Sequence, residues 1–345
     1  MKSFNEQKAE IMCEAFDSLI SIDFHARGIV KPVYEVLRKK VGEPLTLKAA
    51  TGLNKALAED GAVVFISTGF LIAPSMKPET DGPIAAALLA RALNIFGAKP
   101  VIIAEEGVMA CLEGTCIAAE MTPYYDVDKA MQVPHSVALI PYPADIGAAH
   151  KLGNELIEKL DPKAMIDIEH PGKGDDGKYY SALGKELKWP APIDDLFETC
   201  YNRGVFTVGI GDLGNEIGFG YAKPEINDLV PYGALVTTKG TCDAPVMSAV
   251  SDFGAYGVMA ALEAVSGKKG ILHSSRLEDI VVKASVIAGA VEGFTGVPTP
   301  ALDLIDVNYC CAFIEMLHAI LTYSEACSGS RPFFIDFVRG AYDCK

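Results

Sequence analysis

Apolar residues recur at helical spacing near the N-terminus of the chain. Between residues 3 and 23 they return every three or four positions, which predicts a helix, and a second helix is predicted from residue 32 to about residue 40. Beyond residue 60 the pattern changes to short apolar runs. We therefore expect an N-terminal helical segment, residues 1–60, packed on a main α/β domain of residues 61–345.

The apolar runs of the main domain are continuous and alternate with helical or loop segments. Continuous runs are typical of strands that are buried on both faces, as in a parallel sheet. The pattern predicts an α/β fold with a mostly parallel sheet covered by helices on both faces. The runs are AVVFIST (62–68), PVIIAEE (100–106), HSVALIP (135–141), KAMIDIE (163–169), VFTVGIG (205–211) and GALVTTK (233–239).

Helical periodicity separates the first two runs and returns at the C-terminal end. Residues 81–96 form a predicted helix, with Asp81 as its N-cap, Pro83 in its first turn and Gly97 at its end. Beyond Gly254 the pattern is helical again. Further helices are predicted over 255–265, 276–291 and 309–323.

Composition and charge exclude several classes of partner. The chain has 345 residues, 50% of them hydrophobic, and a formal net charge of -15. Nucleic acid and anionic membrane surfaces would be repelled, so we expect neither as a partner. The N-terminus lacks the features of a secretory signal, and no run reaches the roughly 18 apolar residues of a membrane helix. We expect a cytoplasmic protein that acts on a small molecule, with a homo-oligomer possible.

Nine cysteines in a chain of this length do not indicate a disulfide scaffold or a zinc site. None forms a CxxC pair, and Cys310 and Cys311 are adjacent, which disfavours a bridge between them. Cys111 and Cys116 fall in a predicted helix. Buried, reduced thiols are therefore expected.

A glycine-rich loop, GIGDLGNEIGFG (209–220), follows the fifth run. It matches GxGxxG, but Gly218, Gly220 and Pro224 would interrupt the long helix that a dinucleotide loop opens, and a pyrophosphate would face Asp212. We expect no nucleotide cofactor. The loop acids instead favour a cation or a protonated amine, the alternative being a turn with solvated acids.

Polar residues end the other runs, and in an open parallel sheet ligands bind beyond the carboxyl ends of the strands. Glu169 ends one run beside His170, and it could be a general base, a metal ligand, or a surface or capping acid. Only one of Glu105 and Glu106 can point to a given face. The polar loop 171–181 is a candidate lid or an ordinary exposed turn.

Several segments in order resemble the C-terminal domain of the D-glutamate cyclase family, which also occurs as stand-alone proteins. They are ISTGF (66–70), PETDGPIAAALLARAL (78–93), IEHPGKGDDGKYYS (168–181), APIDDLFE (191–198), GIGDLGNEIGFG (209–220), AVSDFGAYGVMAAL (249–262) and VEGFTGVPTPALD (291–303). Leu213, Asp252 and Ala255 depart from the residues that are usual in that family.

The resemblance implies an α/β fold and conversion of D-glutamate to 5-oxo-D-proline with loss of water; some relatives resemble divalent-metal-dependent phosphatases. It implies Glu169, Asp212 and Glu216 as catalytic residues. The implied substrate-binding residues are Thr68, Gly69, Asp81, Asp176, Tyr180, Asn215, Ser251 and Asp252.

The resulting hypothesis is a lyase in which Glu169 takes a proton from the substrate ammonium. A divalent cation, Mn²⁺ or Mg²⁺, held by Asp212, Glu216 and Glu169 would neutralise the γ-carboxylate that an acidic pocket would otherwise repel. Other sources of positive charge are Lys77, Lys173 and Arg91. The alternatives are a metal-dependent phosphatase acting on small phosphoesters and a non-catalytic protein that binds an amino acid or a metal.

Overall fold

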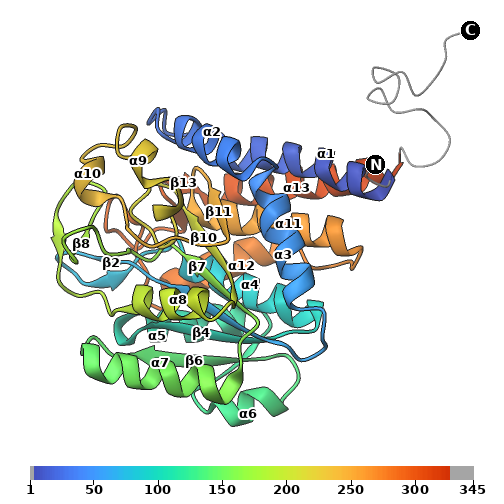
Figure 1. Ribbon diagram of the computed structural model, residues 1–345. Coiled ribbons are helices and arrows are strands. Elements are labelled where there is room, and N and C mark those ends of the chain that lie inside the picture. The colour runs from blue at the N-terminus through green and yellow to red at the C-terminus, as the bar shows by residue number, and fades with distance from the viewer. Residues whose placement is uncertain (1–3, 327–345) are drawn as a thin grey trace, which may run out of the picture.

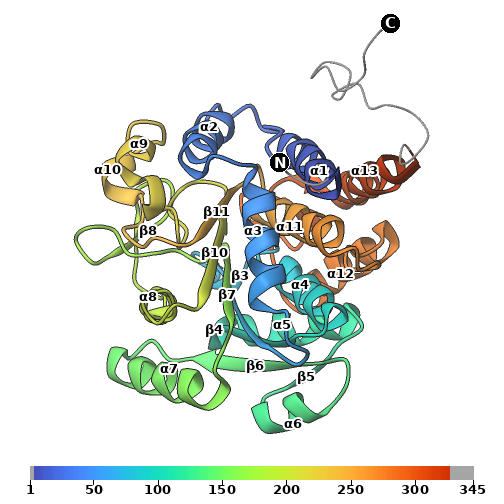
Figure 2. The same ribbon diagram turned by 45° about the vertical axis from the view of Figure 1, so that its right-hand side comes forward.

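A seven-stranded parallel sheet forms the centre of the molecule. The computed structural model describes residues 4–326. In the order β11-β10-β7-β1-β4-β6-β5, each neighbouring pair of strands is parallel. Helices cover both faces, as Figures 1 and 2 show. The α/β fold with a parallel sheet is therefore confirmed.

Five of the six predicted strands are confirmed within a residue or two. The sheet contains β1 (Val63–Thr68), β4 (Lys99–Glu105), β5 (Thr122–Tyr124), β6 (Ser136–Tyr142), β7 (Ala164–Ile168), β10 (Phe206–Gly211) and β11 (Ala244–Met247). Short pairs lie outside it: β2 (Leu71–Ile72) with β3 (Lys77–Pro78), β8 (Tyr179–Tyr180) with β9 (Glu186–Leu187), and β12 (Ala301–Leu302) with β13 (Ile305–Asp306).

The sixth predicted strand, residues 233–239, was wrong. Its first part forms the short helix α10 (Gly233–Val236), and the strand beside β10 is β11, which begins eight residues after α10 ends. A short apolar run has the same composition in a buried strand and a buried helical turn, so periodicity cannot separate them.

The predicted helices are present with small shifts at their ends. The main helices are α1 (Phe4–Ile20), α2 (Val30–Val41), α3 (Leu45–Ala56), α4 (Pro83–Phe96), α5 (Glu106–Ala118), α6 (Val127–Gln132), α7 (Ile146–Leu160), α8 (Ile193–Asn202), α11 (Ser251–Ser266), α12 (Ser275–Ile287) and α13 (Val307–Ala326). After β10 the chain makes only the brief turns η1 (Gly220–Ala222) and α9 (Lys223–Ile226), so the predicted interruption of a long helix is confirmed.

Two hydrophobic cores flank the sheet. Alternate strand residues such as Ile66 and Ile166 pack with α3, α4, α5 and α11 in the larger core, to which α1, α2, α12 and α13 also contribute. Their neighbours Phe65 and Met165 face α6, α7 and α8 in the smaller core. In Figure 2 the two groups of helices lie on opposite sides of the strands. Because the two faces are separated in this way, polar residues on them form separate networks.

Three segments that are distant in sequence meet at the carboxyl edge of the sheet. The turn before α4 is joined to the segment after α12, since Thr80 N donates to Val291 O at 2.9 Å and Val291 N donates to Pro78 O at 2.9 Å. The loop after α1 joins them through His25 Nε2, which lies 2.5 Å from Asp303 O. Residues from both the N-terminal and the C-terminal parts of the chain therefore lie at this edge of the sheet.

No helix in the described part of the chain is long and apolar enough to cross a membrane. The cysteines within residues 4–326 are free thiols, and all of them except the half-buried Cys311 are buried. Cys111 and Cys116 lie in α5, as predicted.

Candidate active site

The glycine loop after β10 folds back so that its acids face the sheet edge. Glu216 accepts hydrogen bonds from the backbone N–H groups of Leu213 (3.0 Å) and Gly214 (2.7 Å). A Cβ on Gly211 would lie 2.5 Å from Glu216 Oε2, so any side chain there would displace the Glu216 carboxylate. Gly214 takes the left-handed conformation (φ 89°). The loop uses the backbone of Leu213 rather than its side chain, which explains how the departure from the family pattern is accommodated.

Glu169 follows β7 with a strained backbone. Its φ is 53°, a left-handed value that non-glycine residues rarely adopt and that is often found at functional sites. The carboxylate accepts a short hydrogen bond from Ser251 Oγ at the start of α11. Glu169 is thereby held between the end of β7 and the N-terminus of α11.

Asp81 and Asp252 cap each other's helices. Asp81 accepts from the backbone N–H groups of Ser251 (3.1 Å) and Asp252 (2.8 Å) at the start of α11. Asp252 accepts from Gly82 N (2.7 Å) and Ala85 N (3.3 Å) at the start of α4. The prediction that Asp81 caps its own helix was wrong, because Gly82 is the N-cap of α4. The exchange fixes the two helix N-termini side by side at the site.

Two groups of carboxylates converge here, and both contain Asp212. Asp81, Asp212 and Asp303 form one group, and Glu169, Asp212 and Glu216 form the other; within each group the ligand atoms lie within 4.8 Å of one another. Glu79 is buried beside them and is influenced by the charges of Asp303, Asp81 and Asp212. We call the following six residues the acidic cluster: Glu79, Asp81, Glu169, Asp212, Glu216 and Asp303.

Burial raises the pKa values of most of these acids. Burial and then the charge of Asp212 raise the pKa of Asp81 to about 6 and that of Glu216 to about 8. The pKa values of Glu79, Glu169 and Asp303 lie well above their usual range, chiefly because of burial and next because of neighbouring acids. Without a cation, the cluster therefore retains protons near neutral pH.

Arg27 supplies positive charge to the cluster, and sequence reasoning missed it. Its Nη2 donates to Asp212 Oδ2 at 3.0 Å and to Ala249 O at 2.5 Å. Arg27 lies in the loop between α1 and α2, 185 residues from Asp212. His25 and Arg27 lie two residues apart in a short loop, which could have marked them as candidate site residues. No spacing rule, however, connects that loop to residue 212.

The three residues that the sequence offered as other sources of positive charge lie elsewhere. Lys77 is exposed on β3, and Arg91 pairs with Glu120 at 3.1 Å. Lys173 pairs with Asp195 at 2.6 Å and with Asp194 at 3.3 Å. None of the ion pairs that Arg91 and Lys173 form here includes an acid of the cluster.

Several buried oxygens at the site lack a protein partner. Thr68 Oγ1, Glu79 Oε1, Asp212 Oδ1 and Asn215 Oδ1 have no hydrogen-bond partner among the described residues. A buried polar atom without a partner costs free energy, about 1–3 kcal/mol. Thr68 is fully buried at the end of β1, and its Oγ1 lies 2.7 Å from where a Cβ on Gly82 would be. These atoms are acceptors that suit a ligand that donates hydrogen bonds or carries positive charge.

The remaining predicted site residues are not all in the cluster. Gly69 follows Thr68 with φ 121°, and a Cβ there would lie 2.9 Å from Val108 Cγ2. Tyr180 is buried, and its carbonyl accepts from Asn215 Nδ2 at 3.3 Å. Its hydroxyl donates to Asp176 at 2.6 Å, and Asp176 is exposed on the 171–181 loop. The structure thus connects Tyr180 to the site through Asn215 but leaves Asp176 outside.

A second buried polar network lies on the opposite face of the sheet. His170 Nε2 is 2.8 Å from Glu105 Oε1, and Ser67 Oγ donates to Asp167 at 2.6 Å. Burial alone would lower the pKa of His170, but the charge and hydrogen bond of Glu105 raise it to about 9. Glu105, and not Glu106, is the buried member of its pair. We call Ser67, Glu105, Asp167 and His170 the histidine network.

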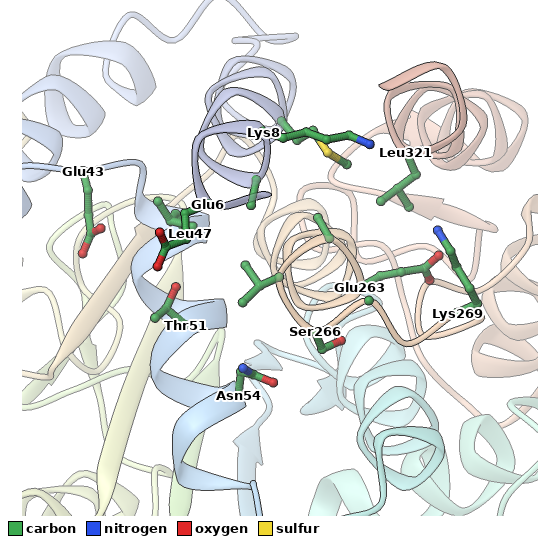
Figure 3. A pocket seen from close by; sticks show the side chains of 15 residues that line it. Glu6, Lys8, Glu43, Leu47, Thr51, Asn54, Glu263, Ser266, Lys269 and Leu321 are labelled. Atoms are coloured by element: carbon green, nitrogen blue, oxygen red, sulfur yellow. The ribbon is translucent and has the colours of Figure 1, made fainter. Parts of the chain in front are cut away.

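A groove of about 680 Å³ lies away from both networks. It is formed by α1, α3, α11 and the end of α13, and Figure 3 shows Glu43, Thr51, Asn54 and Ser266 around it. Its lining contains no member of the acidic cluster or of the histidine network. The groove therefore does not belong to the candidate active site.

Comparison with known proteins identifies the family of the chain. The sequence model of a family described as D-glutamate cyclase-like, C-terminal, matches residues 16–318. The human mitochondrial D-glutamate cyclase is 28% identical to the chain over 225 residues, which is 63% of this chain. The match spans 34% of the length of the human protein. The matched family region contains every residue of the acidic cluster, as well as Arg27.

Proposed function

The chain belongs to the D-glutamate cyclase-like family, and we propose that its acidic cluster converts D-glutamate to 5-oxo-D-proline and water. The observation that carries the proposal is the convergence of Glu169, Asp212 and Glu216, whose carboxylate atoms lie within 4.8 Å of one another. This group stands at the carboxyl edge of the sheet, where ligands of open α/β folds bind.

The same three residues fit a divalent cation. They offer carboxylate oxygens, the ligands that Mg²⁺ and Mn²⁺ prefer, and Asp212 Oδ1 is buried with no partner in the described part of the chain. A bound cation would neutralise the substrate γ-carboxylate and stabilise the oxyanion that develops at its carbon. In the proposed site Glu169, Asp212 and Glu216 would hold it.

Glu169 is positioned to move the protons of the reaction. Its carboxylate is buried within the acidic cluster, where it can accept a proton from the substrate ammonium. It takes a proton from the substrate ammonium, and the freed amine forms a C–N bond with the γ-carboxyl carbon. A C–O bond then breaks, and the oxygen leaves as water with two protons that both came from the ammonium. Ser251 Oγ keeps the Glu169 carboxylate oriented during these steps.

The direct test is an assay of the purified full chain with D-glutamate, with and without Mn²⁺ or Mg²⁺. Formation of 5-oxo-D-proline is followed by chromatography, and L-glutamate serves as the control for chirality. The proposal predicts product that depends on added metal. Absence of product under all conditions would reject the proposed reaction.

One observation favours a second candidate, metal-dependent hydrolysis of small phosphoesters. Two carboxylate groups share Asp212, and two neighbouring cations bridged by a carboxylate are typical of phosphatases. Phosphate release from phosphomonoesters, measured beside the cyclase assay, separates the two reactions. Binding of D-glutamate or metal without either product would favour the non-catalytic alternative.

A further inference from the structure

The loop between α1 and α2 is built to hold Arg27 in one position. Asp23 accepts hydrogen bonds from the backbone N–H groups of Arg27 (3.0 Å) and Gly28 (2.6 Å). Ala26 and Gly28 both take left-handed backbone conformations, with φ of 52° and 76°. His25 connects the loop to the segment after α12 through Asp303 O. The position of Arg27 is therefore set by its own loop and by a contact across the site.

The guanidinium of Arg27 is buried, but its hydrogen-bonding capacity is only partly used. Its side chain is 14% exposed, and Nη2 makes both of the hydrogen bonds described above. Nε and Nη1 are inaccessible to solvent and have no partner within residues 4–326. Leaving charged donors buried and unpaired is costly, which indicates that an acceptor completes them when the site is filled.

Unpartnered donors and unpartnered acceptors thus occur side by side. Arg27 contributes the donors, and it contacts Asp212, whose Oδ1 is one of the unpartnered acceptors. A metal ion alone would satisfy the oxygens and leave Nε and Nη1 of Arg27 unpaired. A small zwitterion, which carries a carboxylate and an ammonium a few bonds apart, would satisfy both sets.

We propose that Arg27 is the anion-binding residue of the site and that an N–H group of its guanidinium left without a partner donates to the α-carboxylate of an amino-acid substrate. This assignment rests on the proposed function, in which the γ-carboxylate belongs to the cation held by Glu169, Asp212 and Glu216. The ammonium, attached to the same carbon as the α-carboxylate, then lies against the acids. Arg27 therefore sets which end of the substrate faces Glu169.

A binding experiment tests this assignment with two ligands. D-Glutamate and D-isoglutamine, in which the α-carboxylate is replaced by an amide, are titrated by calorimetry into the metal-loaded full chain and into Arg27→Gln. We expect Arg27→Gln to weaken D-glutamate binding about tenfold or more, and to change D-isoglutamine binding little. A similar loss for both ligands, or no loss for D-glutamate, would overturn the assignment.

Two further variants keep the test decisive if Arg27→Gln is destabilised. Arg27→Lys retains the charge but loses the N–H groups of the guanidinium, so we expect intermediate affinity for D-glutamate. Arg38→Gln removes an arginine of α2 that pairs with Glu14 at 2.7 Å, and it should leave both affinities unchanged. Circular dichroism and thermal unfolding confirm that each variant is folded. If Arg27→Lys binds D-glutamate as tightly as the unaltered protein does, the assignment of the α-carboxylate to the guanidinium N–H groups is wrong.

The outcomes also separate this inference from the proposed function. If 5-oxo-D-proline forms with the same KM in Arg27→Gln, the reaction stands and the role of Arg27 fails. If D-glutamate binds through Arg27 but no product forms, the subsite stands and the reaction fails. If the unaltered chain does not bind D-glutamate at all, both fail.

Discussion

Two buried polar networks flank strand β7, one on each face of the sheet, and they differ in how their charge is balanced. In the histidine network, His170 lies 2.8 Å from Glu105 and is influenced by the charge of Asp167. In the acidic cluster, the contact of Arg27 with Asp212 brings one positive charge to a group of six carboxyl groups. Each network has oxygens without a hydrogen-bond partner in residues 4–326, including Glu105 Oε2 and Asp167 Oδ2. The two networks therefore differ in how far their negative charge is balanced, and not only in how many of their oxygens have hydrogen-bond partners.

The contrast helps to separate structural polar residues from functional ones. The histidine network contains its own cation, and Glu105 also accepts from Ala191 N at 2.9 Å, so this network connects β4, the end of β7 and the segment before α8. The acidic cluster contains more acid than its contacts neutralise, and burial, followed by repulsion among the acids, raises the pKa values of its members. Repulsion of this kind is tolerated where a ligand removes it.

The largest expected effect is on activity, from Asp212→Asn. Because Asp212 belongs to both carboxylate groups, we expect kcat/KM for cyclisation to fall by at least about 10²-fold and bound metal to be lost. The fold should persist because the change also removes repulsion. Metal content by mass spectrometry and product formation are the measurements. Glu216→Gln should lose metal in the same way; unfolding of both variants would show that the cluster is structural.

The next effect is on stability, and it should differ between the two networks. Glu105→Gln leaves the buried His170 cation without its partner, and we expect the free energy of unfolding to fall by about 3–5 kcal/mol. Asp303→Asn removes one of several repelling acids, and asparagine tolerates the left-handed backbone of residue 303 (φ 46°). Its metal-free stability should fall by less than about 1 kcal/mol or increase. Urea unfolding measures both; equal losses would remove the distinction between the networks.

The third effect is the dependence of metal-free stability on pH. The folded-state pKa values of Asp81, about 6, and Glu216, about 8, lie above the ordinary values of 3.8 and 4.5. Their protonated forms therefore contribute stability that is fully present at acid pH and is lost as the pH rises through about 6 and then about 8. Thermal unfolding should show a falling Tm over this window. Added Mn²⁺ should restore more stability at about pH 8 than at about pH 6, because it replaces the lost protons.

The histidine network should respond at higher pH and without regard to metal. The contribution of His170 to stability is fully present below the ordinary histidine pKa of 6.5 and is lost as the pH rises through its folded-state pKa of about 9, so its window extends beyond that of the acidic cluster. A titration of the imidazole resonances by NMR measures this value directly. A His170 pKa near its ordinary 6.5 would show that Glu105 does not stabilise the imidazolium.

The smallest expected effect is that of Leu213→Gly, which restores the residue that is usual in the family. Glu216 uses the backbone N–H of residue 213, so we expect kcat to change by no more than about threefold. The half-buried leucine side chain packs against the larger core, and its loss should cost about 1–2 kcal/mol of stability. A large change in kcat would instead assign a catalytic role to the side chain.

The sequence by itself determined the parallel sheet and part of the site. Continuous apolar runs identified five strands of the sheet, because a strand that is buried on both faces has no room for alternation. Glu169 and the acids of the loop 209–220 could be placed at the same sheet edge, since each directly follows a strand. Local sequence also predicted that the glycine loop would not open a long helix, and the brief turns after β10 confirm this.

The tertiary structure alone decided which other residues join Glu169 and the loop acids at the site. Asp81 accepts hydrogen bonds from α11, some 170 residues away, and not from its own helix; Arg27 reaches Asp212 across 185 residues; and Asp303 arrives from beyond α12. No periodicity encodes such contacts, because they depend on how the loops cross above the sheet after the strands have paired. Nor does sequence reveal which acids are neutralised. His170 and Glu169 are adjacent in the chain, yet they belong to networks on opposite faces of the sheet, and only burial and the partners on each face give them different roles.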